Sequence, residues 1–157
     1  MNLLISTNQF QNQYLVFLDR RENMIIDGIF SKILYSTSYM ILNGLFISFP
    51  LVYSKKQFSK LNIDFDVFIN KELIKKIAEI EKSILNHYIE FYNIQHKTIN
   101  SDLYQKLQSG SIKYYSSNKY PNEVKKFNYE YYIKISGIWE TNHQIGLTYK
   151  IIEYQTK

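Results

Sequence analysis

Residues 132–150 read YIKISGIWETNHQIGLTYK, and this stretch decides the fold that the sequence predicts. Apolar and polar residues alternate on both sides of the polar loop 141–144, which is the pattern of two half-buried strands joined in a hairpin. Tyrosine and β-branched residues are favoured in strands, and the hairpin is rich in both. We therefore expect strands over roughly residues 127–140 and 145–154.

Three further strands are expected before this hairpin, because β-branched and aromatic residues dominate three earlier stretches. They cover residues 24–34, 39–53 and 61–68, and the third alternates almost strictly between apolar and polar residues. Gly28 would bend the first strand, and Gly44 would form a bulge or a barrel bend in the second.

A helical insert separates these strands from the hairpin. Apolar residues recur at helical spacing over about residues 71–93, and Asn70 stands at the N-cap position. A shorter helix begins at Ser101 and ends at Gly110, and a strand over 111–116 follows. Three strands, a helix and two to three strands are the order of an oligonucleotide-binding (OB) barrel. The fold class that we expect is therefore mainly β with a helical insert, built as an OB-like barrel.

The chain length is that of one domain with a substantial core, and no linker divides it. Residues 1–22 are rich in Asn and Gln around a short apolar patch. We expect an N-terminal arm or an added strand there, and a single OB-like domain over residues 23–157. The sequence has no signal-peptide pattern at its start and no apolar run long enough to span a membrane. We expect a soluble cytoplasmic protein without membrane contact.

The sequence offers no support for catalysis or for a bound cofactor. There are no cysteines, and His87, His96 and His143 lack the spacing of metal ligands. No phosphate-binding loop and no nucleophile motif occurs. Asp64 and Asp66 share a strand face, which is more often a solvated face than a metal or acid–base pair. We therefore expect a non-enzymatic protein without metal or cofactor.

Lysines and aromatic residues gather in two parts of the chain, a combination that neutralises phosphates and stacks bases. The net charge is +5, and the basic excess falls on the strand-rich ends rather than on the helical insert. One cluster covers residues 55–60, and the other runs from residue 113 into the hairpin. The residues that we predict to bind nucleic acid are Lys55, Lys56, Phe58, Lys60, Lys113, Tyr115, Lys119, Tyr120, Lys125, Lys126, Tyr132, Lys134, Trp139 and Lys150.

Alternation along the strand 127–140 divides its side chains between two faces. The more apolar set, expected to pack inward, is Tyr129, Tyr131, Ile133, Ile135, Gly137 and Trp139. The set expected to point outward is Tyr132, Lys134, Ser136 and Ile138. On that outward side, the ring of Tyr132 could stack a base while Lys134 pairs with a phosphate.

Two other interpretations stay open. Lys, Asn, Ile, Tyr and Phe are abundant while Arg, Ala, Gly and Pro are scarce, which is the signature of an A+T-rich gene. The lysine–tyrosine pattern can therefore reflect coding bias alone. Exposed tyrosines also anchor protein interfaces, so the chain can be a non-enzymatic interaction subunit of a virus-like replication or transcription complex.

The segments 134–140, KISGIWE, and 146–150, GLTYK, resemble the closing hairpin of virus-type single-stranded DNA-binding proteins. Proteins of this kind occur in large cytoplasmic DNA viruses and on cytoplasmic linear plasmids. The resemblance implies an OB-type barrel that coats the displaced strand during replication, without catalysis. It also implies that Trp139 and Lys150 belong to the binding site and that the glycine of each segment is a barrel-bend or close-approach position.

The function that these observations favour is sequence-independent binding of single-stranded DNA in DNA replication. Lysines would supply salt-dependent contacts with phosphates, and tyrosines would stack bases. The expected partner is single-stranded DNA, while RNA in its place, contacts with replication proteins and a homo-oligomer stay open.

Overall fold

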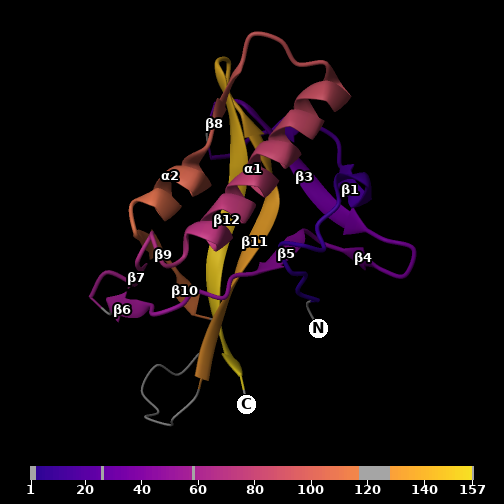
Figure 1. The fold of residues 1–157 in the computed structure, drawn as a ribbon. Coiled ribbons are helices and arrows are strands. Elements are labelled where there is room, and N and C mark those ends of the chain that lie inside the picture. Colours follow the sequence, from indigo (N-terminus) through magenta and orange to yellow (C-terminus); the bar gives the residue numbers. More distant parts are fainter. Residues whose placement is uncertain (1–2, 26, 58, 117–127, 157) are drawn as a thin grey trace.

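The computed structural model describes residues 3–25, 27–57, 59–116 and 128–156, and it shows a mainly β fold with two α-helices (Figure 1). The elements of the first half are η1 (Asn12–Tyr14, a 3-10 helix), β1 (Leu15–Phe17), β2 (Arg21–Glu22), β3 (Ile29–Ser36), β4 (Ile41–Leu42), β5 (Leu45–Ser48), β6 (Lys55–Gln57) and β7 (Asn62–Asp64). The elements of the second half are α1 (Lys71–Tyr92), β8 (Thr98–Asn100), α2 (Asp102–Gln108), β9 (Ser111–Lys113), β10 (Tyr115–Ser116), β11 (Asn128–Glu140) and β12 (Gln144–Thr156).

The main sheet is a curled half-barrel with the strand order β1-β3-β11-β12-β10. The antiparallel hairpin of β11 and β12 forms its centre and is paired along almost its whole length. This confirms the hairpin that residues 132–150 predict. β5 also pairs with β11, and β8 and β10 run parallel to β12.

The long helix α1 covers the inner face of this sheet (Figure 1), and both predicted helices are confirmed. The apolar stripe of α1, the buried residues of α2 and the inner side chains of β11 pack together in one core. The buried members of that core from these three elements are Ile74, Ile77, Ile80, Ile84, Leu85, Tyr88, Leu103, Leu107, Tyr131, Ile133, Ile135 and Ile138. Asn70 is the N-cap residue as expected, but its side-chain amide bonds to the backbone of Val52 rather than to α1.

The predicted second strand, residues 39–53, is divided into two short strands. Gly44 adopts a φ of +118°, which favours glycine, and the chain changes partner there. β4 before it pairs with β3, whereas β5 after it pairs with β11. The bend expected at Gly44 is therefore confirmed, and the continuous strand is wrong.

The predicted third strand, residues 61–68, shortens to β7 and lies outside the main sheet. β7 pairs with β6 and β9 in a separate three-stranded sheet, so part of the lysine-rich cluster 55–60 forms a strand that is absent from the sequence-based prediction. After β7 the chain turns toward α1. The N–H of Phe65 donates to the carbonyl of Gly110 (2.9 Å), and the N–H of Ile69 donates to the carboxylate of Asp66 (2.8 Å).

The N-terminal part of the chain packs against the edge of the main sheet. β1 pairs with β3, so the added strand is present within residues 1–22. Ile5 and Leu15 from this segment are members of the core. β3 itself begins only at Ile29, so Gly28 precedes the strand instead of bending it.

A β-bulge in β11 shifts the side-chain alternation of that strand. Ile135 and Gly137 pair with consecutive residues of β12, so Ser136 is an extra residue in the ladder. β3 comes very close at this point. A Cβ at Gly137 would lie 2.4 Å from the carbonyl oxygen of Ser31 and 2.6 Å from the ring of Phe30, so only glycine fits there.

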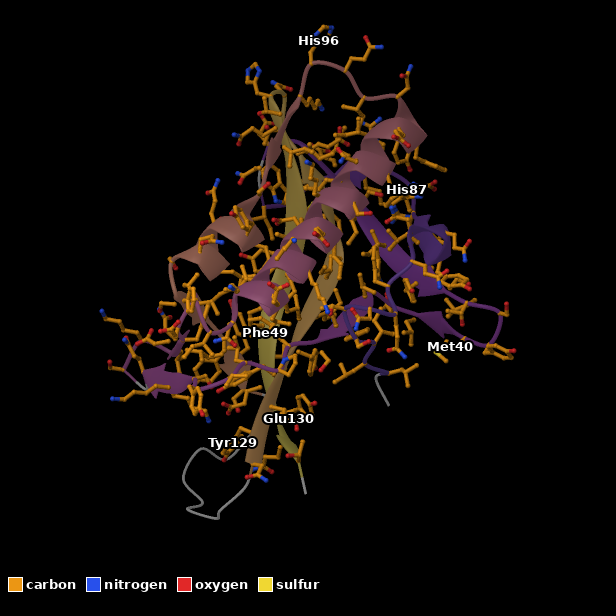
Figure 2. The ribbon with its side chains drawn as sticks, in the orientation of Figure 1. Met40, Phe49, His87, His96, Tyr129 and Glu130 are labelled. Atoms are coloured by element: carbon orange, nitrogen blue, oxygen red, sulfur yellow. The ribbon has the colours of Figure 1, made fainter. Side chains whose placement is uncertain are left out.

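The bulge reverses the predicted faces in the second half of β11. Before it, the residues expected to pack inward are buried from Tyr131 to Ile135. After it, Ile138 is buried and Trp139 lies on the opposite face, so both of these assignments are wrong. Tyr129 lies beyond the core at the far end of the hairpin and is exposed, which also contradicts the expectation (Figure 2).

Candidate nucleic-acid interface

The face of the main sheet opposite α1, which we call the outer face, collects aromatic and basic side chains from five strands. Residues that are directly paired on neighbouring strands share a face. Lys134 is paired with Lys150 of β12 on one side and with Phe46 of β5 on the other. By the same rule, the outer face carries Phe30, Lys32, Phe46, Tyr115, Tyr132, Lys134, Trp139, Thr148, Lys150 and Tyr154.

Three rings form a row at one end of the outer face. Tyr132 stands between Phe46 and Tyr154, with centroid distances of 6.0 and 5.6 Å. Phe46 is buried but is no member of the main core, whereas the two tyrosines are partly exposed. The ammonium nitrogen of Lys134 lies 5.7 Å from the centroid of Phe46. The phenol of Tyr154 donates to the carboxylate of Glu130 (2.6 Å), which fixes the outermost ring.

A second group places cations around Tyr115, whose side chain is 43% exposed. The ammonium nitrogens of Lys113 and Lys150 lie 5.1 and 5.0 Å from the centroid of this ring. Lys150 is also the direct cross-strand neighbour of Lys134. The two ammonium groups are directed to opposite neighbours, Lys134 to Phe46 and Lys150 to Tyr115, so positive charge lies on both sides of the β11–β12 pair. The arrangement therefore favours a bound polyanion.

Trp139 lies toward the opposite end of the outer face. Its indole lies over Gly146, its partner on β12, and its Nε1 donates to the carbonyl of Leu147 (3.2 Å). The indole lines two cavities, one of 760 Å³ beside β2 and β3 and one of 460 Å³ along the edge of β12. The lysines that line the second cavity are Lys106, Lys113 and Lys150.

The structure brings only part of the predicted set together. The predicted residues on the outer face or in its two cavities are Lys113, Tyr115, Tyr132, Lys134, Trp139 and Lys150. Lys55 and Lys60 are exposed on β6 and on the turn that follows it, apart from this group. The predicted residues that lie outside the described part of the chain are Phe58, Lys119, Tyr120, Lys125 and Lys126.

Lys56 forms an ion pair with Glu153, which lies in the second half of β12. Its ammonium nitrogen lies 2.5 Å from the buried carboxylate of Glu153 and 3.7 Å from the centroid of Tyr129. Tyr131 donates to the same carboxylate (3.3 Å). Loss of this cation would weaken the compensation of a buried charge. Lys56 therefore stabilises the fold, and we leave it out of the interface.

Several outer-face residues have no place in the sequence-based prediction. They are Phe30, Lys32, Phe46 and Tyr154. Three of them come from β3 and β5, and the local sequence does not reveal which strands these pair with. The alternation of residues 145–154 was the one available signal, because it places Tyr154 on the face of Lys150.

A buried carboxylate joins the tip of the hairpin to α1. Glu140 accepts two hydrogen bonds from the guanidinium of Arg20 (both 2.9 Å), one from the hydroxyl of Tyr88 (2.6 Å) and one from the ammonium of Lys97 (3.0 Å). Burial alone would raise the pKa of Glu140, but the bonds from Tyr88 and Lys97 and the charge of Arg20 outweigh it and lower the pKa. Because every donor is directed at one enclosed carboxylate, this cluster has a structural role.

No group of three His, Asp or Glu side chains that could hold a metal ion occurs among the described residues, and Figure 2 shows His87 and His96 far apart. In the same part of the chain, no helix has the length and apolar character needed to cross a membrane. Comparisons of the chain with protein families, with curated proteins and with solved structures find no match.

Proposed function

We propose that this chain is a non-enzymatic protein that binds single-stranded DNA on the outer face, without sequence preference, in DNA replication. The row of rings at Tyr132, flanked by the paired Lys134 and Lys150, carries the proposal. A base stacks on Tyr132 while the two lysines pair with flanking phosphates. Each stacked base contributes ~1–3 kcal/mol, and each phosphate contact makes the affinity fall with salt.

The fold that we propose for this function is an OB-like barrel. The pairings of β3 with β11 and of β11 with β12 support it, because the helices fall between these strands in the chain order of such barrels. The far edge of β12 is occupied by β8 and β10 instead of by the predicted third strand. The sheet curls around α1, and this helix covers the face opposite the outer face.

The test is the fluorescence anisotropy of labelled oligo-dT and of duplex DNA of the same length, titrated with the full chain over a salt series. We expect binding of oligo-dT with a negative slope of log affinity against log salt, and much weaker binding of the duplex. No binding of oligo-dT at low salt would contradict the proposal. Equal affinity for oligo-U would extend the ligand to RNA.

A matched pair of double variants locates the binding surface. Lys134→Ala with Lys150→Ala should reduce the magnitude of the salt slope by about 1.4, since each phosphate contact on a single strand contributes about 0.7. The control is Lys75→Ala with Lys76→Ala, which removes the same charge from the exposed side of α1. An equal decrease of the salt slope in both double variants would show that net charge, and not the outer face, determines the binding.

A second candidate function is supported by an apolar turn between β3 and β4. Tyr39 in this turn is 93% exposed, and Ile41, the first residue of β4, is 72% exposed. Exposed apolar side chains of this kind are typical of protein interfaces, which favours an interaction subunit of a virus-like replication or transcription complex. If this turn is a self-association surface, Tyr39→Ser with Ile41→Ser should convert oligomer to monomer in sedimentation velocity and leave the affinity for oligo-dT unchanged.

A further inference from the structure

We propose that the 760 Å³ cavity beside Trp139 receives one nucleobase of the bound strand. This inference rests on the proposed function, because the base reaches the cavity only from a strand that lies on the outer face. It adds an insertion site to the stacking surface around Tyr132, about 20 Å away along β11.

The walls of the cavity are suited to a flat apolar ring system. Its apolar lining residues are Met24, Ile25, Phe30 and Trp139. Its volume lies within the range of about 300–1,000 Å³ that is usual for small-molecule sites. Met24 and Ile25 are 95% and 93% exposed, so a base that enters would cover apolar surface that otherwise faces water. The flexible thioether of Met24 can adapt to the ring that it covers.

The charges on the rim favour a base over a phosphate. Glu22 and Asp27 line the cavity, and their carboxylates repel a phosphate. Arg21, which is paired with Phe30 across β2 and β3, is the single cation among the lining residues. The polar side chains that complete the lining are Asn23, Thr141, Gln144 and Thr148. The cavity is therefore matched to an uncharged polar ring rather than to the backbone of the strand.

The cavity adjoins the basic part of the interface. Trp139 and Thr148 line both the 760 Å³ cavity and the 460 Å³ cavity that contains Lys113 and Lys150. A strand that places its phosphates against these lysines passes directly over the indole of Trp139. The base at that point can turn into the apolar cavity while its phosphate stays on the basic side.

The chain contains a single tryptophan, so its fluorescence reports on this cavity and on the adjoining basic cavity that the same indole lines. Oligo-dT should be added to the full chain while tryptophan emission and oligonucleotide anisotropy are recorded together. We expect Trp139 emission to be quenched with the same midpoint as the rise in anisotropy. A rise in anisotropy with unchanged emission would overturn the cavity proposal and leave the proposed function standing. No change in either signal would overturn both.

Variants on the rim of the cavity distinguish insertion of a base into the cavity from binding elsewhere on the outer face. Met24→Ser with Ile25→Ser should weaken oligo-dT binding about fivefold or more and reduce the quenching, since one base loses its apolar contacts. Because both side chains are exposed, thermal stability should not change. The control is Phe68→Ser, which removes an exposed ring ahead of α1 and should leave both signals intact. Unchanged affinity in the rim variant, or quenching by an apolar peptide but not by oligo-dT, would overturn the proposal.

Discussion

The indole of Trp139 lies so close over Gly146 that a Cβ at residue 146 would stand 2.4 Å from its Cζ2 atom. This contact lets the ring cross β12 and reach the carbonyl of Leu147. It also positions one aromatic side chain between an apolar cavity and a basic one. The glycine thus determines where the indole lies on the outer face.

Gly146→Ala should displace the indole. We expect Trp139 emission to shift to longer wavelength as the ring moves into water, and stability to fall by about 1–3 kcal/mol from overpacking. Emission spectra and thermal denaturation measure both effects. The control is Thr148→Ala at the next outer-face position, which should leave the emission maximum in place. An unchanged spectrum for Gly146→Ala would contradict the close approach.

Tyr132→Ala should lower the affinity for oligo-dT by about 5-fold to 150-fold, because one stacking ring is lost. The ring also covers the buried Phe46, so we expect a stability loss of roughly 1–2 kcal/mol as well. Tyr132→Phe keeps the ring and should preserve both quantities. The measurements are anisotropy and thermal denaturation. A large stability loss with unchanged affinity would make Tyr132 a packing residue only.

Lys56→Ala should destabilise the protein without changing the salt slope of binding. The change removes the ion pair between Lys56 and the buried carboxylate of Glu153, which costs up to roughly 3 kcal/mol. Lys55→Ala is the matched control, because Lys55 is exposed on the same strand and should have little effect on stability. Chemical denaturation and the anisotropy salt series give the two readouts. A smaller salt slope for Lys56→Ala would return this lysine to the interface.

The Glu140 cluster should make stability depend on acidic pH. The pKa of Glu140 is lower in the folded chain than in the unfolded chain. The contribution of this carboxylate to folding stability is therefore complete above about pH 4.5, and it is lost as the pH falls through the folded pKa. Glu140→Gln removes the charge that holds Arg20 and Lys97, and should cost roughly 3 kcal/mol at pH 7. The difference in melting temperature between the two proteins should shrink below about pH 4. A constant difference from pH 7 to pH 3 would contradict this ionisation.

The parts of the fold that the sequence predicts correctly are those that local patterns determine. The helix of residues 71–92 follows from the spacing of its apolar residues, and the hairpin follows from alternation around a polar loop. The division of residues 39–53 into two strands depends on which neighbouring strand each half pairs with. That choice is made by contacts far along the chain, so no local pattern reveals it.

In the candidate site too, the residues that local patterns place were predictable and those that distant contacts place were not. Tyr132 and Lys134 were predictable, because strict alternation holds before the bulge. Trp139 was placed on the wrong face, because the extra residue depends on how closely β3 approaches Gly137. Phe46 was missed because its neighbour Lys134 is far away in the sequence.

Because Ser136 is an extra residue in the ladder, the two halves of β11 turn residues of opposite parity toward the core. In the first half of β11, odd-numbered side chains face the core, and in the second half the even-numbered ones do. If Ser136 instead occupied a regular position in the ladder, the alternation would continue unbroken and every later residue of β11 would change face. Glu140 would then turn toward water and Trp139 toward α1, so the hairpin would lose its anchor and the cavity its aromatic wall.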